Sequence, residues 1–76
     1  MYFDNAIAIH RQRIAATKAH DNYLADRLTE KLDWAVRCHV KEIGGTERKD
    51  YLNVYLSVAS IALGYDKNDP LYVASV

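Results

Sequence analysis

Two histidines and one aspartate of this sequence are candidate ligands for a metal ion. His10, Asp21 and His39 lie on the apolar stripe predicted for segment 3–43, and imidazole with carboxylate is a common zinc ligand set. On one helix they would be about 17 and 27 Å apart along the axis, too far to share an ion. An antiparallel homodimer could bring His10 toward His39, but the same register sets Asp21 against Leu28. We therefore expect no metal site and no cofactor.

Cys38 precedes His39 and so places a nucleophile beside a base in the sequence. Consecutive residues of a helix point about 100° apart, so the two side chains cannot readily act on each other. The sequence also lacks an HExxH or CxxC motif, a glycine-rich phosphate loop and a nucleophile elbow. We expect Cys38 to be a packing residue and the protein not to be an enzyme.

The elements that must position these residues are all predicted to be helices. The Gly-Gly-Thr sequence at 44–46 ends one helix with glycines and caps the next with Thr46. No glycine or proline precedes it, so segment 3–43 is either one long helix or two helices broken near 20–22, where His-Asp-Asn could form a cap. The prediction is an all-α helical hairpin or three-helix unit.

The second predicted helix, 46–63, stops at Gly64, where a run of turn-forming residues begins. Residues 65–76 are expected to form a turn and an apolar tail, which could be a short helix or extended. The whole chain, 1–76, is short enough to be a single domain.

The segment from Tyr51 to Leu63 contains ten apolar residues out of thirteen. Two apolar ridges run along it at helical spacing. The tyrosine ridge consists of Tyr51, Tyr55, Val58, Ala62 and Tyr65, and the leucine ridge of Leu52, Leu56, Ala59 and Leu63. We expect the leucine ridge to pack within the chain on Leu24, Leu28 and Leu32, and the tyrosine ridge to form a homodimer interface, because tyrosine suits interfaces. The alternative is that the tyrosines cap a small core.

Chain length also favours a homodimer or a higher oligomer. A chain of 76 residues buries only about 60% of its unfolded surface and is marginally stable alone. The single cysteine excludes an internal disulfide, which leaves self-association as the expected source of further stability.

Trp34 lies away from the apolar stripe, on the same side as other large polar and aromatic residues. The residues expected to contact a partner protein are Trp34, Tyr23, Arg27 and Arg37. An exposed tryptophan beside arginines suits a protein-binding hot spot or a base-stacking platform. Alternatively, the C-terminal tail covers Trp34. Of these two possibilities, we favour packing of the Trp34 ring within the chain.

The ten basic and ten acidic side chains cancel, so no global field attracts nucleic acid. Arg11, Arg13 and Lys18 form the only basic concentration, and a nucleic-acid-binding regulator that uses them is the alternative function. The helix after the glycine turn is too apolar to lie in a major groove.

The apolar run is shorter than the ~20 residues that span a membrane, and no secretory leader is recognisable. The expected location is the cytoplasm. We expect a small non-enzymatic interaction protein that homo-oligomerises and binds, inhibits or adapts a larger protein. Its size is that of phage- or mobile-element-type inhibitors, an association that rests on length alone.

Overall fold

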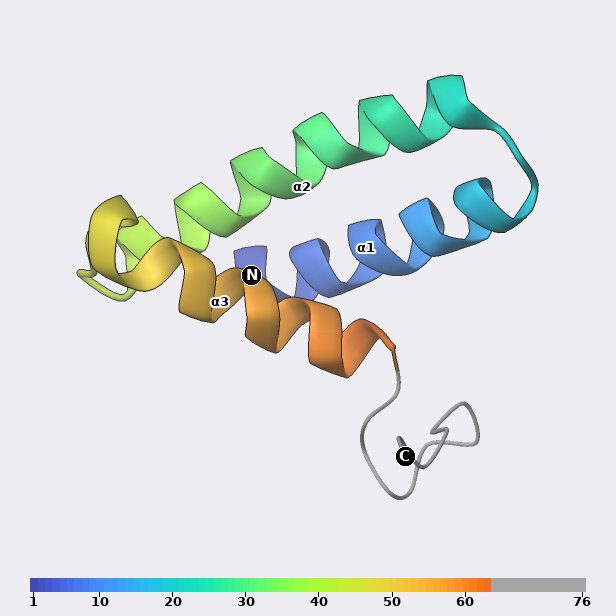
Figure 1. The fold of residues 1–76 in the computed structure, drawn as a ribbon. Coiled ribbons are helices and arrows are strands. Elements are labelled where there is room, and N and C mark those ends of the chain that lie inside the picture. Colours follow the sequence, from blue (N-terminus) through green and yellow to red (C-terminus); the bar gives the residue numbers. More distant parts are fainter. Residues whose placement is uncertain (64–76) are drawn as a thin grey trace.

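The computed structural model describes residues 1–63, which form three α-helices and contain no strand. They are α1 (Tyr2–Lys18), α2 (Asn22–Glu42) and α3 (Glu47–Ala62). α1 and α2 lie side by side as an antiparallel hairpin, and α3 folds back along it (Figure 1). The prediction of an all-α fold is confirmed. The predictions for Gly64 and the tail, including Tyr65, lie outside the described residues.

The chain breaks between α1 and α2 at the position that the sequence left open. His20 has a left-handed backbone conformation (φ 59°), and its N–H donates to the carbonyl oxygen of Thr17 at 3.0 Å. The N–H of Asp21 donates to the carbonyl oxygen of Ala16 at 2.9 Å, which completes a Schellman motif. The Asp21 carboxylate then caps α2 by accepting from the N–H of Leu24 at 3.1 Å. The three-helix alternative is therefore confirmed, and the single long helix is wrong.

The same motif ends α2. Gly44 is left-handed (φ 71°) and its N–H donates to the carbonyl oxygen of Lys41 at 3.1 Å. The N–H of Gly45 donates to the carbonyl oxygen of Val40 at 2.9 Å. Glycine adopts this conformation without a steric penalty, which is why α2 ends here. The predicted end of the helix at the two glycines is confirmed.

Reciprocal hydrogen bonds fix the start of α3. The Thr46 hydroxyl accepts from the N–H of Lys49 at 3.4 Å, and the N–H of Thr46 donates to the Asp50 carboxylate at 2.9 Å. A Cβ at Gly45 would lie only 2.5 Å from Oδ2 of Asp50, so the second glycine leaves room for this cap. The predicted cap at Thr46 is confirmed.

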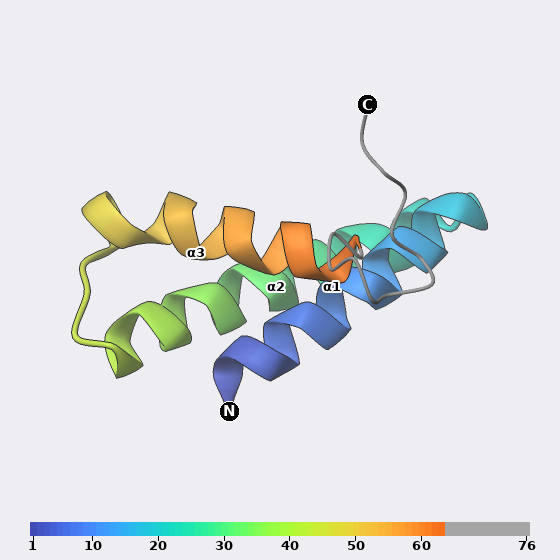
Figure 2. The same ribbon diagram turned by 90° about the horizontal axis from the view of Figure 1, so that it is seen from below.

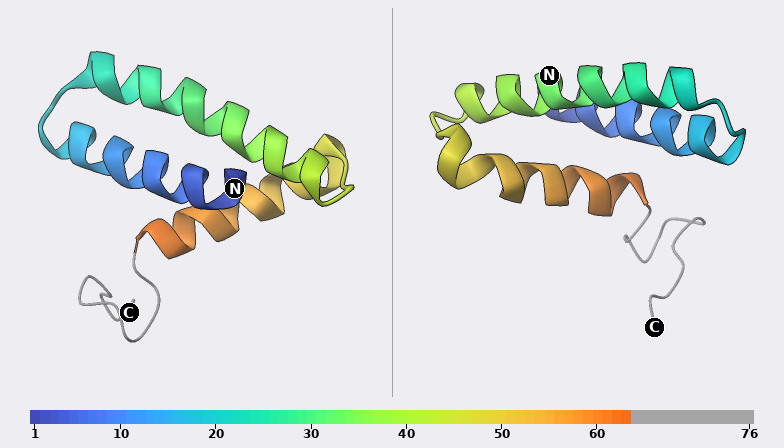
Figure 3. Two further views of the ribbon diagram at one scale, coloured as in Figure 1. Left: turned by 180° about the vertical axis from the view of Figure 1, so that it is seen from behind. Right: turned by 45° about the horizontal axis from the view of Figure 1, so that its top comes forward.

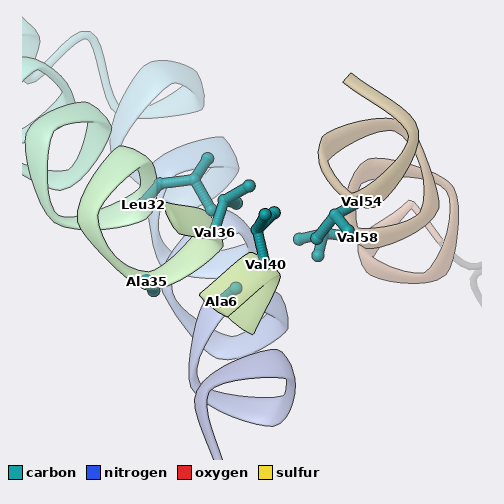
Figure 4. Close-up of a cluster of buried hydrophobic side chains, with 7 residues drawn as sticks. All are labelled: Ala6, Leu32, Ala35, Val36, Val40, Val54 and Val58. Carbon is teal, nitrogen blue, oxygen red and sulfur yellow. The ribbon is translucent and has the colours of Figure 1, made fainter. Parts of the chain in front are cut away.

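Small side chains dominate the core where the three helices meet. Its buried members are Ala6, Leu32, Ala35, Val36, Val40, Val54 and Val58. Figure 4 shows Val54 and Val58 pointing from α3 toward Val36 and Val40 of α2. Alanine and valine allow helix axes to approach closely, and the β-branched valines lose little freedom on burial because few rotamers are open to them. The core is therefore tight but contains few large side chains.

α3 lies against one side of the α1–α2 hairpin. In the views of Figures 2 and 3 the hairpin covers one face of α3, and no other described helix covers the opposite face. One face of α3 therefore packs on the core, and the other is left uncovered by the described helices.

Candidate functional site

The two faces of α3 have different surroundings. Val54, Val58 and Ala62 are buried, with Val58 only 1% exposed, and Tyr51 and Tyr55 pack against the edge of the core. On the opposite face Leu52 is 64% exposed, Leu56 53% and Leu63 46%. The described part of the tyrosine ridge is therefore the inner face, and the leucine ridge is the outer face.

The predicted packing of the leucine ridge on α2 is wrong. Leu32 belongs to the core cluster with Val54 and Val58 of α3, against which Tyr51 and Tyr55 also pack. Leu28 is buried outside that cluster, and Leu24 is itself 44% exposed. Val58 and Ala62, which were assigned to a dimer interface, complete the core of a single chain. Whether the exposed parts of Tyr51 and Tyr55 contact a second chain stays a prediction.

Polar partners explain why tyrosines can face inward. The Tyr51 hydroxyl donates to the Asp33 carboxylate, and the Tyr55 hydroxyl accepts from Nη1 of Arg13 at 2.8 Å. Burial, followed by the hydrogen bond to Asp33, raises the pKa of Tyr51 to about 12. Each ring covers apolar surface while its hydroxyl reaches a polar group at the rim.

Arg37 belongs to the junction between α2 and α3. Its guanidinium lies 3.0 Å from the Asp33 carboxylate and 3.5 Å from that of Glu47, and its Cζ lies 5.9 Å from the centre of the Tyr51 ring. These groups are about half exposed, so the ion pairs contribute little to stability. Arg37 was predicted to contact a partner, but its contacts here are within the chain.

The basic N-terminal segment also makes contacts within the chain. Arg13 donates to Tyr55, and Nη2 of Arg11 lies 3.4 Å from the carbonyl oxygen of Ile61. Lys18, at the end of α1, is exposed. Two of the three residues proposed for nucleic-acid binding therefore connect α1 to α3.

The histidines occupy separate positions. His10 is buried in α1, with its ring centre 6.2 Å from that of Tyr55, and His39 packs on Phe3 with ring centres 4.9 Å apart. Within residues 1–63, neither Nδ1 atom has a hydrogen-bond partner, although Nδ1 of His39 lies 3.6 Å from Glu42. Burial and the nearby charge of Arg13 lower the pKa of His10. Both effects favour the neutral form of this imidazole over the charged form.

The residues considered for chemistry do not converge. Asp21 caps α2, and Cys38 is a half-buried free thiol. Across the described part of the chain, no three His, Cys, Asp or Glu side chains come close enough to hold a metal ion.

Trp34 projects from α2 on the side opposite the core. Its ring is 55% exposed and contacts Tyr2 edge-on, with ring centres 5.3 Å apart. Tyr23, 73% exposed, lies three turns away on the same face, where Arg27 donates to its hydroxyl at 3.2 Å. Within residues 1–63, Tyr2 is the aromatic neighbour of Trp34, and about half of the tryptophan stays exposed. The predicted cover by the C-terminal tail lies outside the described residues.

No family model, curated protein or solved structure matches this chain. Its function is therefore inferred from its own residues. None of α1, α2 and α3 combines the length and the apolar character that a membrane span requires.

A polar strip beside the leucine ridge marks the outer side of α3. Asn53, Ser57 and Ser60 line a shallow hollow next to Leu56 and Ile61, and all five side chains are exposed. Polar residues at i, i+4 and i+7 usually indicate the solvent side of a helix. This strip was visible in the sequence and was the signal that the leucines next to it face outward.

Proposed function

We propose that the chain is a small non-enzymatic interaction protein that associates with copies of itself and binds a larger protein, as an inhibitor or an adaptor. The observation that carries the proposal is the outer face of α3, where three leucines are about half exposed or more and lie outside the core cluster of residues 1–63. Fully burying a leucine is worth about 1.5 to 3 kcal/mol, so leaving several in water is unfavourable unless a partner covers them.

The outer face of α2 supports binding to a second protein. Trp34 and Tyr23 are large, rigid side chains that project from the side of α2 opposite the core. Tryptophan and tyrosine are enriched among the residues that contribute most to protein interfaces. Because this face and the leucine ridge belong to different helices, one chain could use both at the same time.

Affinity capture from a lysate of the source organism tests the proposed binding of a larger protein through the outer face of α2. The bait is the wild-type chain, with Trp34→Ala as the disrupting variant and Leu24→Ala as the matched control. Leu24 is also exposed on α2, but it does not lie along the line from Tyr23 to Trp34.

We expect one protein to be retained by the wild type and by Leu24→Ala, and to be reduced at least about tenfold by Trp34→Ala, which corresponds to loss of a hot spot. Equal retention by all three baits, or nothing above background, would remove the partner-binding part of the proposal.

A further inference from the structure

We propose that the leucine ridge of α3 pairs with the leucine ridge of a second copy of this chain, with the two helices antiparallel. The inference rests on the self-association proposed above and names the surface and the register that produce it. Within residues 1–63 the three leucines of the ridge are exposed, Ala59 is half-buried, and none of the four belongs to the buried core cluster.

The spacing of the ridge is that of a coiled-coil seam. Leu52, Leu56, Ala59 and Leu63 follow one another at intervals of four, three and four residues, which are the alternating a and d positions of a heptad. In an antiparallel pair, each a position meets a d position of the other helix. Leu56 then meets Ala59 of the second copy, and Leu52 meets Leu63. A large leucine side chain therefore faces a small alanine at the centre of the seam, and two leucine side chains face each other at both of its ends.

This arrangement makes the ridge complementary to itself. A closed dimer with a two-fold axis brings the same patch of both subunits together, so each contact occurs twice. Every member of the ridge has an apolar counterpart in the antiparallel register. The polar residues Asn53 and Ser60 lie beside the ridge, where they would form a wet rim.

The distribution of charged side chains on α3 favours a second copy of this chain as the partner and an antiparallel arrangement of the two helices. Residues 51–63 carry no charged side chain, so this face offers no counter-charge to an acidic or basic partner. Lys49 occupies the next a position before Leu52, and a parallel pair would oppose two Lys49 ammonium groups. Antiparallel pairing separates them. The formal net charge of zero also removes long-range repulsion between copies.

The extent of the ridge indicates a weak dimer. One face of a 16-residue helix offers less than the about 800 Å² per partner that is typical of stable interfaces. We therefore expect a dissociation constant in the micromolar range.

A charge-pair experiment tests both the surface and the register. Leu52→Glu and Leu63→Lys each place a charge against a leucine of the second copy, twice per dimer. Sedimentation velocity should find self-association weakened at least about tenfold in each variant alone. In a one-to-one mixture, the two introduced charges face each other in one layer while Leu63 and Leu52 remain paired in the other. The mixture should therefore regain association.

Leu24→Glu is the control, because it changes an exposed leucine of α2 and should associate like the wild type. Far-UV circular dichroism should show the same helix content in every variant, since neither charge opposes the α3 dipole.

Three results would count against the inference, and they are distinguishable. No recovery in the mixture would exclude the antiparallel register. Single variants that associate like the wild type would exclude the leucine ridge while leaving self-association intact. A wild-type chain that stays monomeric across the concentration series would remove self-association itself.

Discussion

The inner and outer faces of α3 are both apolar, yet only one of them holds the chain together. The inner face presents valines to the core and tyrosines to its edge, whereas the outer face presents leucines to solvent. Leucine is the more hydrophobic choice for burial, so hydrophobicity alone does not decide which face packs inward. The distance between helices and the polar partners available at the rim decide it instead.

The inner face is fixed by contacts from two other helices. Arg13 of α1 and Asp33 of α2 each form a hydrogen bond with one tyrosine hydroxyl, and the α3 valines belong to one buried cluster with Val36 and Val40. The leucine ridge finds no such partners on the hairpin. Side chains of the inner face should therefore affect the free energy of unfolding, and those of the outer face should affect association.

The largest difference between the faces is expected for truncation to alanine. Val58→Ala removes two methyl groups from a side chain that is 1% exposed and should lower the free energy of unfolding by about 2 kcal/mol. Leu56→Ala should change it by less than about 0.5 kcal/mol at concentrations where the chain is monomeric. Urea unfolding followed by circular dichroism measures both. A larger loss for Leu56→Ala than for Val58→Ala would reverse the assignment of the faces.

A smaller effect is expected at the rim of the inner face. Tyr55→Phe keeps the ring but removes the hydroxyl that accepts from Arg13, and should cost about 1 kcal/mol of unfolding free energy. Tyr23→Phe is the matched control, because its hydroxyl accepts from Arg27 in an exposed position and should cost close to nothing. Equal urea midpoints for both variants would mean that the bond to Arg13 does not fix the inner face.

The smallest expected effect depends on pH and comes from His10, which packs beside Tyr55. Burial and the nearby Arg13 charge lower the pKa of His10 in the folded chain below its ordinary 6.5. The unfolded state therefore binds the proton first. Stability is fully present above pH 6.5 and falls as the pH drops from 6.5 toward the lowered pKa.

At pH 6 the loss from His10 should reach at most about 0.8 kcal/mol. Urea midpoints between pH 7.5 and 5.5 measure it, with His10→Gln as the comparison, since glutamine does not titrate. A slope that is the same in both proteins would assign the pH dependence to other groups.

The two helix-ending turns explain how much of the fold could be predicted from sequence. Both turns have the same hydrogen-bonded motif, with Gly44 in one and His20 in the other at the left-handed position. Glycine makes that conformation inexpensive, so the turn at 44–46 could be predicted with its cap. A left-handed histidine costs about 1 kcal/mol or more. The hydrogen bonds of the turn, the Asp21 cap and the packing of α1 on α2 together offset this cost. That packing is not readable from residues 20–22.

The candidate site could be predicted only in part for a similar reason. Helical spacing is sufficient to predict both ridges and the position of Trp34 away from the apolar stripe of α2, although packing of the Trp34 ring was favoured over exposure. The choice of inner ridge depends on Arg13 and Asp33, which lie 42 and 18 residues from their tyrosines in the sequence. Contacts at that separation follow from the three-helix arrangement and not from local pattern.

Static light scattering on the wild type and Leu56→Glu tests the central claim most directly. We predict that the wild-type mass rises from monomer toward dimer with concentration, while Leu56→Glu stays monomeric and keeps the wild-type urea midpoint measured at low concentration. The claim would be contradicted if Leu56→Glu unfolded, because the leucine ridge would then belong to the core. It would equally be contradicted if Leu56→Glu associated as strongly as the wild type.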